Sequence, residues 1–500
     1  MLVGVVALVV ASLAMLPGVA FWDTGELQTV GPLMGTAHPT GFPTYVLLGW
    51  FASVVLQPLG EPAFRMNVLA ALSVAVAAGV TVDLVRGLTG WLVLGVAAGI
   101  GLVLTPIVWA IATHAETHAL HLAFVAILLW LLVAWDDRVR PSGASTRSGD
   151  RFLVAAAVVF GLAVGNHSLT LLLAIPVGLY VLAVDPEIWR RPRLVWSCVG
   201  ALAVTLIVVY LELPLRAGPF RAPLVYGSPD TLEGFVSIVF AEQFRGSLAD
   251  PFGDLPRKLA DLIDRTAAQF WIFAPLVPVA FVATAVRMPR YALLTGSAVA
   301  ITAFFAASYE NADIGRYYLG PALMAWTWLA ILAAAAIRGL VASGGLGRGP
   351  ELTGVGAPQA GLTALLIAFG LVVPSVFAIP SRVEGARAVR EIDARDWTDH
   401  VLDAMAPDAV IVSWWSYSTP LWYAQLVQGR RQDLTIVDDR SRLDERLGSM
   451  TDVIDANLGT RPVYVIRIDP KEIDLLTARY ELEFIDGVDA SKLTRVIGRR

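Results

Sequence analysis

Long apolar segments recur along this 500-residue chain, and they constrain its fold more than any other feature. A helix needs roughly 20 mainly apolar residues to cross a hydrocarbon core of about 30 Å. About 11 such segments precede residue 380, near residues 2–20, 67–84, 91–112, 118–135, 152–165, 168–184, 195–213, 268–286, 291–308, 318–337 and 361–379. Hydrophobic residues make up 56% of the chain and charged residues 16%. We therefore predict a polytopic α-helical membrane protein, and a net charge of only −5 gives no sign of a nucleic-acid partner.

The distribution of arginine predicts which ends of the spans face the cytoplasm, because short cytoplasmic loops carry the excess of Lys and Arg. The segment 44–56 is short and lies between Pro43 and Pro58, so we expect a half-buried or interfacial helix that does not cross. With a cytoplasmic N-terminus, the cytoplasmic loops then hold Arg86, Arg138, Arg140, Arg147, Arg190, Arg191, Arg193, Arg287, Arg290, Arg338 and Arg348. The unusual polar segments all fall on the opposite, extracytoplasmic side.

The chain changes character near residue 381, where the long apolar segments stop and charges become frequent. Short β-like segments (409–415, 434–439 and 461–468) alternate with helical ones (418–429 and 442–458). Such alternation is typical of an α/β unit with a largely parallel sheet. We predict a transmembrane domain over residues 1–380 and an extracytoplasmic α/β domain over residues 381–500.

Two carboxylates directly follow the first apolar segment, in the sequence WDTGE. Because charges are costly within a bilayer, the span should end near Trp22. The glycines and prolines between residues 31 and 43 then predict a folded loop on the outer membrane surface. Asp23 and Glu26 are candidate site residues, and the alternative is an ordinary helix cap, because T/D-x-x-E is also a capping-box pattern.

Histidines follow in three places on the same side. TAHPTGFPTY holds His38 and Tyr45 on a backbone stiffened by prolines, as functional loops often are. HAETHALH spaces its histidines at i, i+4 and i+7, so His114, His118 and His121 share one helical face with Glu116 expected to point elsewhere. This spacing permits a shared metal ion, and the alternatives are substrate contacts or solvated histidines. In GNHS, an amide and an imidazole interrupt two apolar segments, so Asn166 and His167 should face a cavity.

Arginines on the outer side run against the usual bias. They are Arg65, Arg216, Arg221, Arg245 and Arg316, the last followed by Tyr317 and Tyr318. A guanidinium matches phosphate oxygens with two parallel hydrogen bonds, which suggests a phosphorylated lipid headgroup. The alternative is ion pairing with Glu212, Glu242 or Asp313.

These motifs together resemble a known family. WDTGELQ, AHPTGFPTY with Arg65 and Asn67, HAETHAL, GNH and PLWYAQLVQGRRQDLTIVDD are similar to sequences of the GT-C glycosyltransferases. The similarity is greater to the bacterial branch related to the transmembrane protein O-mannosyltransferases. The segment SWWSYSTPLWYAQ lacks the acidic pair expected shortly before PLWY, so it departs from the family pattern there.

The resemblance implies an inverting transfer of a sugar, expected to be mannose, from a polyprenyl-phosphate donor to a protein, glycan or lipid acceptor. Asp23 would be the general base, and Glu26 and Glu116 its supporting or acceptor-orienting partners. His38, Asn166, His167 and Arg316 would contact substrate. The family implies a GT-C-like catalytic domain in the inner membrane of a bacterium, with its active site on the extracytoplasmic side. No cofactor is expected with certainty, and a divalent metal stays open.

The remaining candidate substrate-binding residues come from the residue patterns, namely Tyr45, Arg65, His114, His118, Arg216 and Tyr317. Two other functions remain as alternatives. A transporter or flippase of a lipid-linked sugar would place charges near the bilayer midplane and often contains inverted repeats, whereas here the charges gather at one edge. A noncatalytic scaffold for the C-terminal domain would leave the DTGE and HPTGFP motifs unexplained.

Overall fold

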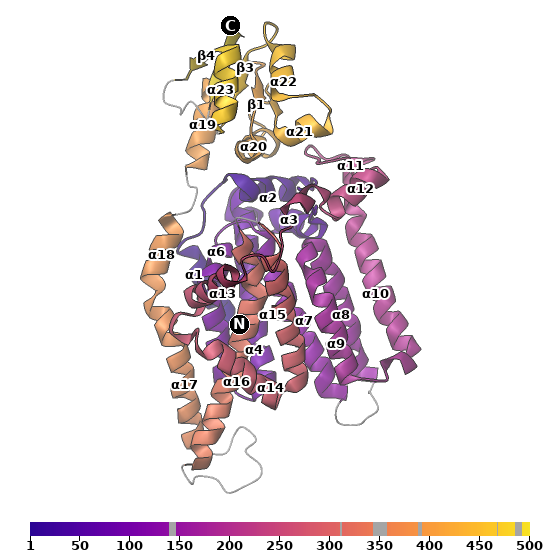
Figure 1. Ribbon diagram of the computed structural model, residues 1–500, viewed down its shortest axis with the longest axis vertical. Coiled ribbons are helices and arrows are strands. Elements are labelled where there is room, and N and C mark those ends of the chain that lie inside the picture. Colours follow the sequence, from indigo (N-terminus) through magenta and orange to yellow (C-terminus); the bar gives the residue numbers. More distant parts are fainter. Residues whose placement is uncertain (140–146, 311–312, 344–357, 389–392, 468, 486–492) are drawn as a thin grey trace.

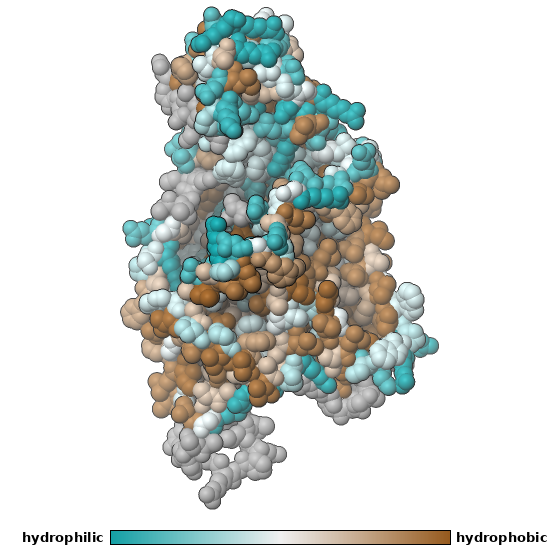
Figure 2. All heavy atoms as spheres, in the orientation of Figure 1, coloured by the Kyte–Doolittle hydropathy of each residue, from teal (hydrophilic) through white to brown (hydrophobic). Residues whose placement is uncertain are grey.

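The computed structural model describes residues 1–139, 147–310, 313–343, 358–388, 393–467, 469–485 and 493–500. A helical bundle forms one end of the elongated molecule, and a small domain with a β-sheet forms the other (Figure 1). Apolar side chains cover most of the visible face of the bundle, and polar ones gather on the C-terminal domain (Figure 2). Arg140 and Arg348 of the predicted cytoplasmic loops lie outside the described residues.

Seven helices within the described ranges are long and apolar enough to cross a membrane, or eight if one bent pair counts as a span. The seven spans are built on α4 (Pro62–Thr89), α7 (Thr117–Val139), α8 (Arg147–Asn166), α10 (Pro192–Tyr210), α15 (Pro289–Ala307), α16 (Leu319–Ser343) and α17 (Pro358–Phe377). Shorter apolar helices are α1 (Leu2–Ser12), α3 (Pro43–Val55), α5 (Leu92–Val103) and η2 with α9 (Ser168–Leu173 and Ala174–Val184). The predicted integral membrane protein is confirmed, and the number of 11 spans stays a prediction.

Proline breaks two of the predicted spans. The segment predicted at 91–112 forms α5 and a separate α6 (Pro106–Ile111), because Pro106 lacks the N–H that a continuous helix needs and instead starts a new one. The segment predicted at 268–286 is α13 (Leu255–Phe270) with η5 (Trp271–Phe273), followed after Pro275 by α14 (Leu276–Arg287). The two parts of this second segment meet at 83°.

The predicted outer loop after the first span is wrong in part, since residues 22–33 form helix α2 (Trp22–Leu33). Glycine here serves close packing: a Cβ on Gly31 would lie 2.7 Å from Cε of Met66, and one on Gly49 of α3 would lie 3.1 Å from Cα of Gly31. Pro32 falls in the last turn, where it interrupts little of the helix. Tertiary packing therefore overrides the helix-breaking tendency of these residues.

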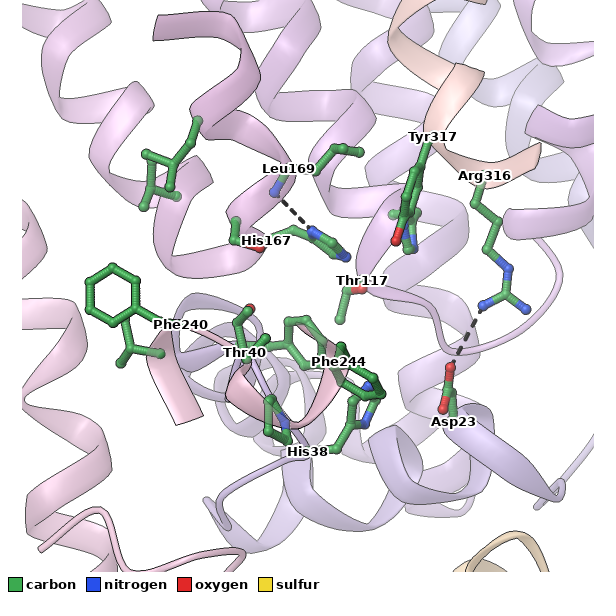
Figure 3. A pocket seen from close by; sticks show the side chains of 18 of the residues that line it. Asp23, His38, Thr40, Thr117, His167, Leu169, Phe240, Phe244, Arg316 and Tyr317 are labelled. Atoms are coloured by element: carbon green, nitrogen blue, oxygen red, sulfur yellow. Dashed lines mark hydrogen bonds and ion pairs between the residues drawn. The ribbon is translucent and has the colours of Figure 1, made fainter. Parts of the chain in front are cut away.

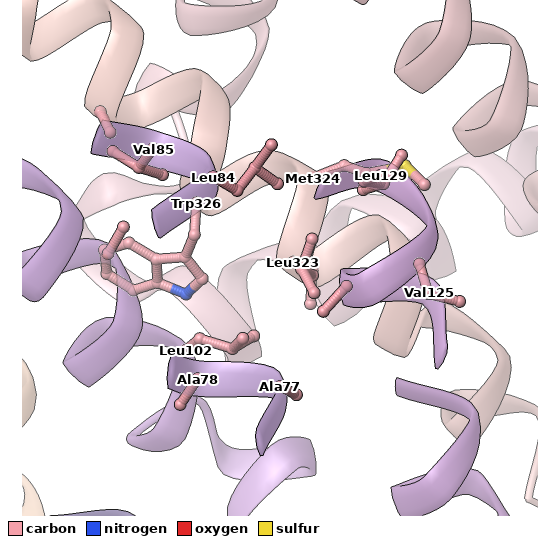
Figure 4. Packing of buried hydrophobic residues seen from close by; sticks show 14 of the residues in the cluster. Ala77, Ala78, Leu84, Val85, Leu102, Val125, Leu129, Leu323, Met324 and Trp326 are labelled. Carbon is pink, nitrogen blue, oxygen red and sulfur yellow. The ribbon is translucent and has the colours of Figure 1, made fainter. Parts of the chain in front are cut away.

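The bundle core lies where α4, α5, α7 and α16 meet (Figure 4). Trp326 of α16 is 2% exposed and lies against Gly101 of α5, where a Cβ would come within 2.4 Å of its ring. Its indole Nε1 donates a hydrogen bond to Thr105 Oγ1 at 2.9 Å. Small residues such as Ala77 and Ala78 of α4 let the helices approach closely, as is common between helices in membranes.

The C-terminal domain contains a five-stranded sheet with strand order β2-β1-β3-β5-β4. Its strands are β1 (Val410–Val412), β2 (Thr435–Val437), β3 (Val463–Val465), β4 (Tyr480–Phe484) and β5 (Thr494–Arg499). β1 is parallel to β2 and β3, whereas β5 is antiparallel to β3 and β4. The α/β class and the first three strands agree with the sequence prediction, and the largely parallel sheet is corrected to a mixed one.

Helices surround this sheet: α19 (Ala394–Ala404), α20 (Trp415–Trp422) with the π-helical turn η7 (Tyr423–Val427), α21 (Asp439–Asp444), α22 (Met450–Asn457) and α23 (Pro470–Arg479). Helix α18 (Ile379–Ala388) precedes them and contains residue 381, so the predicted domain boundary stays a prediction. The remaining elements are η1 (Gln57–Leu59), η3 (Ile188–Arg190), α11 (Glu212–Ala217), α12 (Leu232–Val239), η4 (Glu242–Ser247) and η6 (Ile314–Tyr318).

The C-terminal domain packs directly on α2, with α20 and α21 on the side that faces the bundle (Figure 1). Trp22 meets Trp414 edge to face, with ring centroids 5.0 Å apart. The hydroxyl of Tyr423 accepts a hydrogen bond from the backbone N–H of Ala63 at 3.0 Å. A Cβ on Gly25 would lie 2.7 Å from Thr419 Oγ1, so α2 and α20 approach very closely. This docking brings the C-terminal domain to the carboxylate-bearing helix.

Candidate active site

A cavity of about 810 Å³ lies where the bundle, the first outer segment and the C-terminal domain meet. Its polar lining includes Asp23, His38, Glu116, His118, His167, Arg316, Tyr317 and Arg440. Its apolar lining includes Leu169, Leu171, Leu206, Phe240, Phe244 and Phe305. Figure 3 shows Asp23 and Arg316 on one side of this pocket and Phe240 on the opposite side. The cavity thus has a charged end and an apolar end.

Arg316 contacts one carboxylate of the WDTGE motif and one of the HAETHALH motif. Its Nη1 lies 2.8 Å from Glu116 Oε2 and 3.9 Å from Asp23 Oδ2, the second contact drawn in Figure 3. Its Nη2 lies 3.2 Å from Asp313 Oδ2. The Glu116 side chain is 3% exposed, whereas that of Asp23 is 38% exposed. Of Asp23 and Glu116, Asp23 is therefore the carboxylate that a substrate in the cavity can reach, and Asp313 at the cavity wall is also exposed.

Glu26 and His38 form a second pair beside Asp23. His38 Nδ1 lies 2.5 Å from Glu26 Oε2, and the backbone N–H of His38 donates to Glu26 Oε1 at 2.7 Å. Both oxygens of Glu26 are thus used to hold the HPTGFP segment against α2. The alternative capping-box role of Glu26 is excluded, because Phe21 is the N-cap residue and no side chain caps this helix.

A buried pair of amides holds both acidic segments in place. Gln28 and Asn67 are fully buried, and Gln28 Nε2 donates to Asn67 Oδ1 at 2.9 Å. Gln28 Oε1 accepts from the backbone of Ala20, and Asn67 donates to Leu16 O at 2.8 Å and accepts from Ala115 N at 2.8 Å. These bonds connect α2, the segment before it and the loop that carries Glu116. The spacing of the acidic motifs is therefore set by the scaffold.

The carboxylates have different proton affinities. Burial raises the pKa of Asp23, and the carboxylates of Glu26 and Glu116 raise it further. Burial also acts to raise the pKa of Glu26, but His38 outweighs it and lowers this pKa. Although burial tends to lower the pKa of His38, Glu26 raises it, so the contact favours the charged forms of both groups. Burial would raise the pKa of Glu116, yet Arg316 holds it well below its usual range. Asp23 is thus the one carboxylate of the three whose pKa the site raises.

The histidine motif differs from its prediction. Helix α7 begins at Thr117, so His114 lies before it rather than on a shared face with His118, and it does not line the cavity. Glu116 does not point elsewhere, since its Oε1 lies 2.8 Å from His118 Nδ1. The ring of His118 also lies 4.6 Å from that of His167, centroid to centroid, and the His167 Nδ1 accepts a hydrogen bond from the backbone of residue 169.

Within the described ranges, the histidines of this motif do not form, with other ligand residues, a group of three or more that could hold a metal ion. The group that does is Asp23, Glu26 and His38, whose ligand atoms lie within 4.8 Å of one another. These three residues belong to α2 and the loop after it. The sequence pattern suggested a shared metal only for the histidines of HAETHALH.

Two arginines that were predicted to bind substrate instead donate hydrogen bonds to the backbone and stabilise the fold. Arg65 donates to backbone carbonyls of Gly60 and Ser53 at 2.6 and 2.7 Å. Arg216 donates to Leu33 O at 3.0 Å and Met34 O at 2.7 Å, at the C-terminal end of α2. Guanidinium groups commonly satisfy such unpaired helix carbonyls. Neither residue lines the cavity. Their location in the outer segments is therefore explained by these hydrogen bonds to backbone carbonyls.

Two other predicted residues lie just behind the cavity wall. Tyr45 is 1% exposed and belongs to the core beneath the first outer segment. Asn166 is fully buried, and its Nδ2 donates to Thr117 O at 3.0 Å, so it fixes the start of α7. Both support lining residues without contacting the cavity.

Sequence reasoning missed the contribution of the C-terminal domain, whose residues Trp415 and Arg440 line the cavity. Trp415 follows β1, and its ring lies 5.9 Å from that of His38. Arg440 follows β2, in α21. The available signal was their position directly after two predicted parallel strands, since ligand sites gather at such strand ends.

Comparison with known proteins places this geometry in context. Residues 23–190 match the family Protein O-mannosyl-transferase TMEM260 N-terminal domain. The chain is 29% identical over 232 residues to Protein O-mannosyl-transferase TMEM260 of Mus musculus, which covers 44% of this chain and 31% of that protein. It is 23% identical over 282 residues to the tmem260 protein of Dictyostelium discoideum, covering 52% and 33%. The chain spans about a third of the length of these curated relatives.

Solved structures resemble the whole chain. ArnT from Cupriavidus metallidurans, bound to undecaprenyl phosphate, superposes with a TM-score of 0.59 at 16% identity, over 99% of this chain and 97% of that one. The chain has a GT-C fold. A second GT-C structure, the oligosaccharyltransferase of Archaeoglobus fulgidus in complex with Zn and sulfate, has a TM-score of 0.52 at 13% identity, over 93% of this chain and 68% of that one. The predicted resemblance to GT-C glycosyltransferases and O-mannosyltransferases is confirmed.

Proposed function

We propose that this protein is a membrane glycosyltransferase that moves a sugar, expected to be mannose, from a polyprenyl-phosphate donor to a hydroxyl acceptor with inversion. The observation that carries the proposal is a cavity in which a reachable base, Asp23, faces an apolar wall. The names of the relatives and the GT-C fold support it. The complex of ArnT with undecaprenyl phosphate supports a lipid-phosphate donor.

The reaction would use these residues as follows. The acceptor oxygen attacks the anomeric carbon as the bond from that carbon to the phosphate oxygen breaks, and the bonding electrons leave with the lipid phosphate. Asp23 takes the acceptor proton, for which its raised pKa suits it. Glu116 holds Arg316 in place beside Asp23, and Glu26 fixes the loop of His38. His118, His167 and Tyr317 would contact the sugar from the cavity wall.

The apolar part of the cavity suits the isoprenoid tail. Leu171 is 52% exposed and Phe240 is 64% exposed, and both line the cavity together with Leu206 and Phe244. A donor that diffuses in the bilayer could insert its tail there while its headgroup lies near Asp23. No nucleotide-binding loop is required for such a donor.

Sidedness forms part of the proposal. The α9–α10 connection with Arg190 and Arg191, and the α14–α15 turn with Arg287, lie at the end of the bundle away from the C-terminal domain (Figure 1). Short cytoplasmic loops are enriched in arginine. This distribution supports a cavity and a C-terminal domain on the extracytoplasmic side of a bacterial inner membrane, with the catalytic domain over residues 1–380.

The decisive experiment is product analysis. The full chain in lipid nanodiscs is incubated with a panel of polyprenyl-phosphate sugars and with protein, glycan and lipid acceptors, and the products are analysed by mass spectrometry. We expect a mass increase of one hexose on one acceptor class, with the mannosyl donor preferred. Transport of lipid-linked sugar across sealed vesicles without any glycosylated product would instead identify a flippase and contradict the proposal.

Activity should depend on pH in a direction set by Asp23. Because its pKa is raised, the carboxylate becomes protonated, and unable to accept a proton, at a higher pH than an ordinary aspartate of about 4. We expect kcat/KM to fall about tenfold per unit as pH drops below this raised pKa. Glu116→Gln removes a charge that raises the pKa of Asp23, so the acidic limb should move to lower pH. If the fall in kcat/KM instead begins at a higher pH in Glu116→Gln, Asp23 is not the group whose protonation stops the reaction.

A further inference from the structure

Three arginines line the cavity, and they differ in how far their charge is already neutralised. Arg316 lies within 4.0 Å of three carboxylates, namely Asp23, Glu116 and Asp313. Arg245 pairs with Glu242 at 2.9 Å. Arg440 makes no ion pair with any described residue, and its Nη1 is buried without a hydrogen-bond partner. A buried donor left without an acceptor is costly, so this N–H group is open to a hydrogen bond with an oxygen of a ligand.

The structure holds Arg440 rigidly. Its guanidinium lies over the ring of Trp415 at 4.2 Å and over that of Tyr226 at 5.2 Å, measured to the centroids. Trp415 Nε1 donates to the Tyr226 hydroxyl at 3.0 Å, which fixes the two rings relative to each other. A guanidinium stacked on ring faces keeps its in-plane N–H groups free for an oxygen ligand.

Helix α21, which carries Arg440, is fixed at both ends. Asp438 and Ser441 form a capping box at its start. At its end, Asp444 accepts a hydrogen bond from the backbone N–H of Gly227 at 2.8 Å. The first contact belongs to the C-terminal domain, and the second anchors the helix to the outer segment between α11 and α12. Arg440 is therefore held in place at the boundary between the C-terminal domain and this outer segment.

Sheet topology points to the same location. After β1 the chain forms β2, which pairs with one edge of β1. It later forms β3, which pairs with the opposite edge of β1. Ligands of open α/β sheets bind beyond the carboxyl ends of strands at such a switch point. Trp415 and Arg440 follow β1 and β2 there, and this strand edge faces the cavity.

We propose that Arg440 binds the phosphate oxyanion of the lipid donor, so that the C-terminal domain completes the donor site. This inference rests on the proposed function. A phosphate approaching Arg316 would also meet Asp23 and Glu116, whose charges repel it. Near Arg440 the carboxylates of Glu26, Asp438 and Asp444 act on it electrostatically, but none of the three forms an ion pair with it, and Glu26 is paired with His38. Arg440 is thus the cavity cation whose charge is available to an anion.

In the reaction, the bond between the anomeric carbon and the phosphate oxygen breaks, and its electron pair stays on that oxygen. The N–H groups of Arg440 would donate to the phosphate as this charge develops, which lowers the barrier. The acceptor proton moves to Asp23. Two different cations would then act in the reaction. Arg316 lies beside the base, and Arg440 would bind the leaving phosphate.

The test measures binding of the lipid without any transfer. Full-length protein in nanodiscs is titrated with undecaprenyl phosphate, with undecaprenol, which has the same tail and no phosphate, and with inorganic phosphate as a competitor. We expect Arg440→Gln to weaken binding of undecaprenyl phosphate by about 10- to 100-fold and to leave undecaprenol unchanged. Arg440→Lys, which keeps the charge without the planar fork, should lie between the two. Arg446→Gln, on an exposed arginine of the same domain, should bind as the unaltered protein.

The outcomes separate the two proposals. If the unaltered protein prefers undecaprenyl phosphate to undecaprenol and Arg440→Gln keeps this preference, Arg440 is not the phosphate ligand and the inference is overturned. If the unaltered protein does not distinguish the two lipids, the lipid-phosphate donor of the proposed function is itself contradicted. Competition by inorganic phosphate that disappears in Arg440→Gln would support a phosphate site independent of the tail. Unchanged thermal unfolding of the variants shows that folding is intact.

Discussion

Replacement of Asp23 by asparagine is expected to reduce sugar transfer by about 10²- to 10⁴-fold, the usual contribution of a general base. The amide has nearly the same shape as the carboxylate but cannot accept the acceptor proton. Asp23 contributes one ion contact, at 3.9 Å to Arg316, and its side chain is 38% exposed, so the fold should not depend on its charge. Initial rates with the mannosyl donor, measured with saturating lipid, check this expectation.

A matched control separates loss of the base from a general loss of charge. Asp230 is an exposed aspartate of the outer segment between α11 and α12, and Asp230→Asn should retain full activity. Binding of undecaprenyl phosphate should be at least as strong in Asp23→Asn as in the unaltered protein, because the substitution removes a negative charge from the cavity and leaves Arg440 in place. Retention of more than about a tenth of the activity in Asp23→Asn would assign the base to another group.

Arg316→Gln is expected to have the largest effect on stability. Removing one partner of a buried ion pair costs about 3 to 5 kcal/mol, because it leaves the other charge buried and uncompensated. Glu116 is 3% exposed, but Arg316 itself is 26% exposed, so we expect the lower end, about 3 kcal/mol. The measurement is thermal unfolding in detergent, where the midpoint should fall, together with a loss of transfer activity as the carboxylates repel one another.

The double variant Arg316→Gln/Glu116→Gln tests the cause of this loss. If an unpaired Glu116 charge is responsible, its neutralisation should restore much of the stability. Transfer activity should stay low in the double variant, because the cation beside Asp23 is still absent. A double variant as unstable as Arg316→Gln alone would show that the arginine stabilises the fold by packing instead of charge.

The sequence predicted the membrane class, the apolar helices and most of the polar cavity lining, because these follow from local patterns. A charge at the end of an apolar segment, as at Asp23, is expected outside the hydrocarbon core, because its burial there is costly. Histidine in HPTGFP and arginine before two tyrosines were likewise recognisable in the sequence. The structure brings His38 and Arg316 to the same cavity as Asp23.

The errors arose where tertiary contacts decide. Helix α2 exists because Gly31 allows contact with Met66 and α3, a relation that no local pattern shows. Arg65 and Arg216 look like anion ligands in sequence, yet they bind backbone carbonyls that only the folded chain exposes to them. Arg440 lies far from the acidic motifs in sequence and reaches the cavity only through the docking of the C-terminal domain on α2.

That docking also has a consequence for biosynthesis. The acidic helix leaves the ribosome early, whereas Trp415 and Arg440 are translated long after it, and domains generally fold as they emerge. A nascent chain can therefore insert its helices and admit a lipid before the chamber has its upper wall. If Arg440 binds the leaving phosphate as proposed, a chain without this wall would cleave the donor more slowly, which would limit loss of the sugar to water during synthesis.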